Sequence, residues 1–192
     1  MQTRVINMIT RPKDEWPVAA AEPTTFNSLF VGYVVPLAAI PAVCGFLGSL
    51  LFVSALGYRA GFGVALGSAI LGYVFSLVGV YVSALVIQKL APTFKSDGDL
   101  TQALKLVAYS MTPMWVAGVL YLIPLLGILV LLAGLYGIYV FYLGVRPTMR
   151  TPEDQVIPYM VVSALVVIVI SIVLGLIAGA ITAAMFLTSR VL

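Results

Sequence analysis

Residues 106 to 145 read LVAYSMTPMWVAGVLYLIPLLGILVLLAGLYGIYVFYLGV and contain no charged side chain. As a single α-helix this stretch would be about 60 Å long, roughly twice the thickness of the hydrocarbon core of a bilayer. It must therefore turn back on itself. The best break is at residues 122 to 127, LIPLLG, because proline starts a helix well but disrupts one internally, and a glycine follows closely. The pattern predicts two membrane helices, at about residues 103 to 122 and 125 to 145.

Uncharged stretches of the same kind occupy most of the remaining chain. The 192 residues are 62% hydrophobic and only 9% charged, whereas a soluble domain is about 45–50% apolar and about 25% charged. This composition excludes a soluble globular protein. The charged clusters that separate the apolar stretches predict further helices at about residues 27 to 56, 62 to 88 and 156 to 187. The expected fold class is an all-α integral membrane protein with five transmembrane helices, and residues 1 to 192 form a single membrane domain.

The basic residues predict the orientation of the chain, because cytoplasmic loops are enriched in Lys and Arg. A cytoplasmic N-terminus leaves only Arg59 and Arg190 outside. The basic residues that it places inside are Arg4, Arg11, Lys13, Lys89, Lys95, Lys105, Arg146 and Arg150. All seven acidic residues fall on the same side in this arrangement. We therefore expect an outside C-terminus and a cytoplasmic working face.

Residues 1 to 26 carry apolar side chains at roughly helical spacing beside basic ones. Val5, Met8, Ile9 and Trp16 are the apolar members, and this pattern predicts an amphipathic segment in the headgroup layer. A simple interfacial anchor is the favoured interpretation and a partner-binding surface the alternative. The candidate partner or lipid surface at this membrane face comprises Arg11, Lys13, Asp14, Glu15, Trp16, Glu22, Lys95, Asp97, Asp99, Arg146 and Arg150. We expect its acids to pair with nearby basic residues rather than to gather around a cation.

Small residues recur at steps of four on two of the predicted helices. Ser68, Gly72 and Ser76 mark the second helix, and Gly175 and Gly179 mark the fifth. Small side chains let helix backbones approach closely in a membrane. These positions predict close packing within the bundle, with a homodimer contact along the fifth helix as the alternative.

Polar groups and prolines within the predicted spans need partners, because water is absent from the bilayer core. Two prolines of the first helix should bend or open it and leave carbonyls that must be satisfied inside the bundle. Two tyrosines of the fourth helix lie deep, and polar residues at the start of the third could bond them. The resulting candidate polar cavity consists of Pro36, Pro41, Tyr109, Ser110, Thr112, Tyr136 and Tyr139. Purely structural hydrogen bonding is the favoured interpretation, and the cavity is the alternative.

Several function classes are disfavoured by what the sequence lacks. There is no histidine and only one cysteine, Cys44, and no Asp, Glu, Lys or Arg lies deep inside a predicted span. An enzyme and an ion-coupled transporter are therefore disfavoured, and we expect no cofactor and no metal. The net charge of +3 is too small, and the basic residues too scattered, to indicate binding to nucleic acid. We expect a non-enzymatic membrane protein that organises membrane or recruits membrane or cytoplasmic proteins. The alternative is a small channel or transporter for ions or neutral solutes that uses the broken first helix.

Three local sequences carry a resemblance to a known family. They are RPKDEWP at residues 11 to 17, ALKLVAYSMTP at 103 to 113, and GLYGIY at 134 to 139, which leads into TPEDQ at 151 to 155. With five spans, the chain resembles the bacterial branch of the Yip family, the Rab-interacting membrane proteins. The resemblance implies membrane trafficking or organisation through partners in eukaryotic members, and location in the bacterial inner membrane for this chain. The Asp-Leu-Tyr-Gly-Pro motif of eukaryotic members does not occur in this sequence.

Overall fold

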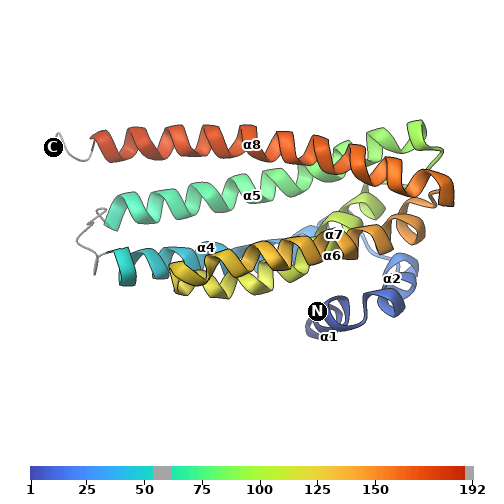
Figure 1. Ribbon diagram of the computed structural model, residues 1–192, viewed down its shortest axis with the longest axis horizontal. Helices are drawn as coiled ribbons and strands as arrows, with labels where there is room; N and C mark the ends of the chain where they lie inside the picture. Colours follow the sequence, from blue (N-terminus) through green and yellow to red (C-terminus); the bar gives the residue numbers. More distant parts are fainter. Residues whose placement is uncertain (54–61, 189–192) are drawn as a thin grey trace.

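The computed structural model describes residues 1–53 and 62–188, and within them every regular element is helical. Five helices are long and apolar enough to cross a membrane, and they lie side by side in one bundle (Figure 1). The candidate spans are Phe26–Leu51, Phe62–Phe94, Leu100–Leu122, Gly127–Met149 and Glu153–Ala184. The prediction of five membrane helices is thus confirmed. Arg59 and Arg190, on which the predicted orientation depends, lie outside the described residues.

The elements follow one another in a simple order. Before the first span come α1 (Gln2–Thr10) and α2 (Pro12–Ala21). The first span contains α3 (Phe26–Leu29), the π-helical η1 (Phe30–Val34), α4 (Val35–Gly48) and the π-helical η2 (Ser49–Val53). The later elements are α5 (Phe62–Leu90), η3 (Ala91–Phe94), α6 (Leu100–Ala117), η4 (Gly118–Leu122), η5 (Pro124–Leu126), α7 (Gly127–Met149), η6 (Glu153–Gln155) and α8 (Val156–Thr188), with η3 to η6 being short 3₁₀ helices.

The central hairpin breaks where the sequence predicts. Element η4 ends at Leu122 and α7 begins at Gly127. The third helix begins earlier than predicted because Asp99 caps it, with its Oδ1 accepting a hydrogen bond of 2.7 Å from the backbone N–H of Gln102. The fourth helix continues past Arg146 to Met149. Charged residues therefore do not mark where the helices begin and end.

The first span is irregular on both sides of its prolines, as its composition indicates. The π-helical η1 ends just before Pro36, and η2 follows Pro41. One carbonyl of this span obtains a side-chain partner, since Tyr73 Oη donates to Val35 O at 2.8 Å. Pro36 is nevertheless exposed, and Pro41 is only half-buried. The prediction that both prolines lie inside the bundle is wrong for Pro36, because α4 presents that side of its surface outward.

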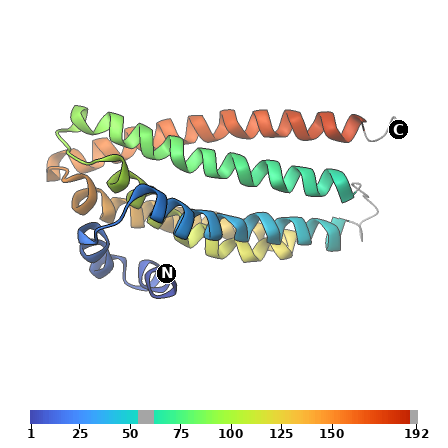
Figure 2. The same ribbon diagram turned by 180° about the vertical axis from the view of Figure 1, so that it is seen from behind.

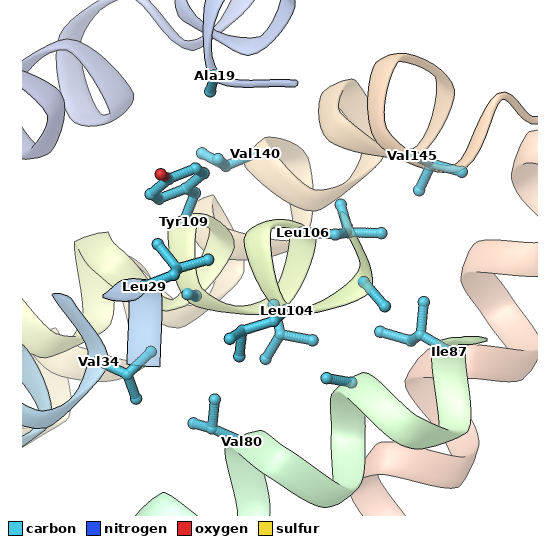
Figure 3. Close-up of a cluster of buried hydrophobic side chains, with 14 of the residues drawn as sticks. Ala19, Leu29, Val34, Val80, Ile87, Leu104, Leu106, Tyr109, Val140 and Val145 are labelled. Atoms are coloured by element: carbon cyan, nitrogen blue, oxygen red, sulfur yellow. The ribbon is translucent and has the colours of Figure 1, made fainter. Parts of the chain in front are cut away.

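The bundle has two layers around a core at one end. α5 and α8 lie beside each other, while α4, α6 and α7 form the other layer, and both views agree on this arrangement (Figures 1 and 2). α1 and α2 pack against α6 and α7 at one end. Buried side chains from α2, α5, α6 and α7 meet there, including Ala19, Ile87, Leu104, Leu106 and Val140 (Figure 3). The core is thus concentrated beneath the N-terminal helices.

Most of the predicted small-residue contacts are not made. A Cβ built on Gly72, Gly175 or Gly179 would meet no heavy atom within 4 Å among the described residues. The prediction of close packing within the bundle is therefore wrong for these three glycines. α8 instead faces α5 along a neighbouring stripe, where a Cβ on Gly79 would lie 3.7 Å from Leu174 Cδ1. Periodicity identifies a smooth helix face but not the direction in which that face points.

Candidate functional site at the charged end of the bundle

The N-terminal helices are fixed to the bundle by a buried tryptophan. Trp16 on α2 donates from Nε1 to Val140 O of α7 at 2.9 Å. A Cβ on Gly144 would lie only 2.4 Å from Trp16 Cζ2, so a glycine is required where the indole ring crosses α7. Tyr136 Oη donates to Ile9 O at 2.8 Å and holds the end of α1 in the same way. The α1–α2 pair is therefore a docked part of the fold.

This docking corrects two predictions. Trp16 is buried and does not belong to an exposed partner or lipid surface. Tyr136 bonds a carbonyl of α1 and not Tyr109, Ser110 or Thr112, which the sequence suggested as partners. Hydropathy shows that an apolar face exists, but it does not say whether lipid or protein covers it. That the pair also lies in the headgroup layer stays a prediction.

Arg4 occupies the centre of the interface between the two N-terminal helices and α6. Its guanidinium forms ion pairs with Glu15 and Glu22, and Asn7 Nδ2 donates to Glu15 Oε2 at 2.8 Å. The guanidinium carbon lies 5.7 Å from the centroid of the Tyr109 ring, in range of a cation–π contact. The expected pairing of the two acids is confirmed. Their partner is one that sequence reasoning did not single out, because Arg4 lies eleven and eighteen residues from them.

Lys105 forms a second link between α6 and the N-terminal helices. Its side chain is 2% exposed, and Nζ donates to Ala20 O at 3.1 Å and to Glu22 O at 2.6 Å. Gln102 Nε2 donates to Ala20 O as well, at 3.1 Å. These carbonyls end α2 and have no partner within the helix, so a cation there also complements the helix dipole. The sequence marked Lys105 only as an orientation signal, and its actual role depends on where α2 ends.

The loops that follow η3 and α7 are tied to each other. Ser96 Oγ donates to Thr151 Oγ1 at 2.8 Å, and the backbone N–H of Asp97 donates to Met149 O at 2.9 Å. Arg150 Nη1 lies 3.5 Å from Asp97 Oδ2. These contacts join segments that lie about fifty residues apart in the chain, and they hold the exposed charges in a fixed arrangement.

The predicted surface residues gather at this end of the bundle, which we call the charged end. It comprises α1, α2, the loop at residues 95–99 and the segment at residues 146–155, which contains the end of α7 and η6. Glu15 is half-buried and Trp16 is buried. The exposed members are Arg11, Lys13, Asp14, Glu22, Lys95, Asp97, Asp99, Arg146 and Arg150. Among the described residues no group of three His, Cys, Asp or Glu side chains could hold a metal ion.

The residues of the predicted polar cavity do not line one space. Thr112 Oγ1 bonds Tyr33 Oη at 2.8 Å within the core. Tyr109 is enclosed by rings, with Tyr33 edge-on at 5.0 Å between centroids and Trp16 at 5.8 Å. Tyr139 is exposed. The cavity alternative is therefore wrong. Thr112 and Tyr136 make structural hydrogen bonds, as the favoured interpretation predicts.

Pro41 and Ser110, two residues of the predicted cavity, line two separate grooves. Pro41 lines a groove of about 370 Å³ between α4 and α5, together with Ser68 and Ser76. Ser110 lines a separate groove among α5, α6, α7 and α8. Ser68 and Ser76 each donate a hydrogen bond to a carbonyl of their own helix.

The sequence model of the Yip1 domain family matches residues 6–187 of this chain, from within α1 through most of α8. The chain belongs to this family. Two similar proteins are both called inner membrane protein YohC, one from Escherichia coli strain K12 and one from Escherichia coli O6:H1. Each is 26% identical over 164 residues, which cover 80% of this chain and 82% of the relative. No solved structure matches.

These findings confirm the family resemblance. The relatives and the five spans together make this Yip1 domain protein a multi-pass protein of the bacterial inner membrane. The family match includes the second half of α1 and all of α2 as well as the spans. The docked α1–α2 pair is therefore part of the domain.

Proposed function

We propose that this Yip1 domain protein is a non-enzymatic membrane protein that recruits protein partners at its charged end, on the cytoplasmic side. The observation that carries the proposal is the convergence of three charged segments, residues 1 to 22, 95 to 99 and 146 to 155, at one end of the bundle. Lys105 and the Ser96–Thr151 hydrogen bond hold them in place. A fixed surface with charges of both signs favours specific, steered association with a complementary protein.

The buried anchors of the N-terminal helices support this proposal. Trp16 and Met8 pack inward, so the exposed Arg11, Lys13 and Asp14 stand on a helix pair that is already ordered. A partner that binds them does not have to order the segment, and that saving favours affinity. A freely moving amphipathic tail would not offer this advantage.

Site-specific photo-crosslinking in cells tests the recruitment. A photoreactive amino acid replaces Lys13, Lys95 or Arg146 at the charged end, and Leu125, exposed in the turn between α6 and α7, serves as the control. We expect one shared protein adduct from the three charged-end positions and none of that size from Leu125. The charge reversal Lys13→Glu should weaken the adduct formed from Lys95 while the protein remains folded.

Different adducts from each of the three positions, or adducts unaffected by charge reversal, would reject the proposal. Deleting residues 1 to 22 is a poorer test than these substitutions, because it would remove Trp16 and uncover the core beneath it.

A second candidate, passage of a small neutral solute, is favoured only by the groove between α4 and α5. Its lining is largely apolar, and three serine hydroxyls and Tyr73 are the groups that would contact a polar solute. Flux into vesicles containing the purified protein tests it, with Ser76→Leu as the variant that narrows the groove. Solute entry no faster than into empty vesicles would exclude this candidate.

A further inference from the structure

A groove of about 300 Å³ lies among α5, α6, α7 and α8. Its lining is almost wholly apolar and includes three methionines, Met111, Met114 and Met160. Methionine is unbranched and polarizable, so it adapts to flexible apolar ligands. The volume is at the lower end of the range for small-molecule pockets, about 300–1,000 Å³. It therefore suits one flexible chain rather than a bulky molecule.

Two serine hydroxyls in this groove have no hydrogen-bond partner in the part of the chain that the structure describes. Ser110 on α6 is 6% exposed and Ser163 on α8 is 1% exposed, yet the Oγ of each is buried without a hydrogen bond among the described residues. Ser83 lines the same groove and bonds Gly79 O at 2.6 Å, which is how serines in membrane helices ordinarily satisfy themselves. Leaving a buried hydroxyl unpaired is costly. Two such donors in one apolar groove point to an acceptor supplied by a ligand.

The depth of the groove indicates where that acceptor lies. Ser110 follows Tyr109, whose ring is 5.7 Å from the Arg4 guanidinium, and Gly137 of the groove follows Tyr136, which bonds α1. The groove therefore lies at the same depth along the bundle as the charged N-terminal helices, but it is formed by different faces of α6 and α7. The span containing α8 has 32 residues, about 48 Å of helix against a hydrocarbon core of about 30 Å. With the charged N-terminal helices at the membrane surface, the excess length places the first turns of α8 outside the hydrocarbon, and we infer that Ser163, ten residues after Glu153, lies near the layer of lipid ester groups.

We propose that this groove binds a glycerophospholipid of the surrounding bilayer. One acyl chain lies against Met111, Met114 and Met160, and an ester carbonyl of the lipid accepts hydrogen bonds from the hydroxyls of Ser110 and Ser163. The ester supplies the acceptor oxygen for both serine hydroxyls, and the acyl chain fills the apolar space among α5, α6, α7 and α8. The lipid site does not depend on partner recruitment at the charged end.

A photoreactive phospholipid tests the site. The protein is reconstituted in vesicles of phosphatidylethanolamine and phosphatidylglycerol that contain a small share of phosphatidylethanolamine with a diazirine in one acyl chain. After illumination, mass spectrometry locates the labelled residues. We expect labelling concentrated at Met111, Met160 and their neighbours in the groove. Labelling spread evenly over the outer apolar faces of the bundle would overturn the proposal.

Matched variants separate groove binding from general contact with lipid. Ala164→Phe puts a ring into the groove and should abolish labelling there, while Ile172→Phe adds the same ring on an exposed face of α8 and should leave labelling unchanged. Ser110→Ala with Ser163→Ala should reduce groove labelling about fivefold to tenfold, as expected for two lost hydrogen bonds. Ser171→Ala is its control, since Ser171 already donates to Val167 O.

The double serine variant keeps the test decisive if Ala164→Phe fails to fold, because it removes two oxygen atoms and adds no bulk. Unchanged labelling in the double variant would overturn the role of the ester carbonyl. A photoreactive amino acid at position 160 that joined two protein chains would overturn the lipid as occupant and place a second copy in the groove.

Discussion

α6 and α8 are both membrane helices, but they are buried to very different extents. In the most apolar 18-residue window of each span, 67% of residues are buried in the span of α6 and 6% in that of α8. The mean hydropathy shows the opposite order, with 1.3 for the span of α6 and 3.1 for the span of α8. The less apolar helix is therefore the central one. In a bilayer high hydropathy marks contact with lipid, whereas a helix with Lys105 and Thr112 must find partners inside the protein.

Glycines show the same contrast between α7 and α8. Gly144 on α7 lies directly beneath the Trp16 ring and Gly179 on α8 faces open space, although both follow similar apolar patterns. One glycine is required by a contact and the other is not required by any contact within the described residues. Substituting these glycines therefore distinguishes a helix whose contacts hold other elements in place from a helix that makes few such contacts.

Gly144→Val should have the largest effect. The new Cβ would lie 2.4 Å from Trp16 Cζ2 and 2.7 Å from Leu106 Cδ1, and overpacking of this kind costs about 3 kcal/mol. We expect a matching loss in the free energy of unfolding, measured by titrating denaturing detergent into mixed micelles. Proteolytic cleavage within α1 and α2 should become faster, because the Trp16 ring can no longer pack against α7. An unchanged cleavage rate would show that Trp16 does not hold them.

Lys105→Met should have the next largest effect. The methionine fills similar space but leaves Ala20 O with only Gln102 and leaves Glu22 O without its Lys105 bond. We expect unfolding to become easier by about 2 kcal/mol. Lys89→Met is the matched control, since Lys89 is exposed at the end of α5. Equal stability of the two variants would mean that the Lys105 link adds nothing to docking.

The sequence was sufficient for the number of spans and the central break, because both follow from the scarcity of charge and from Pro124. It was not sufficient for the site. Trp16 and Arg4 differ in polarity, yet both point into the protein, since their partners come from α7, α2 and the segment after α2. Periodicity describes one helix at a time. Contacts such as Trp16 to Val140, which lie 124 residues apart, depend on how helices are arranged.

Arg150→Gly should have a small effect of opposite sign. Arg150 ends α7 with a φ of 50°, a left-handed conformation that disfavours side chains with a Cβ and suits glycine. We expect stabilisation of about 0.5–1 kcal/mol, because the exposed pair with Asp97 that is lost contributes little. Arg146→Gly, within the helical part of α7, should instead destabilise by about 1 kcal/mol. Destabilisation by both variants would show that the Asp97 contact outweighs the backbone preference.

Gly179→Leu should have the smallest effect on the folded chain. A Cβ at this position meets nothing within 4 Å among the described residues, so the leucine projects from α8 without displacing a neighbour. We expect the same unfolding midpoint as the unsubstituted protein, in direct contrast with Gly144→Val. Light scattering after size-exclusion chromatography gives a second readout of this variant. A smaller particle than that of the unsubstituted protein would mean that the glycine face of α8 meets a second copy, because only a contact outside the single chain remains for the leucine to break.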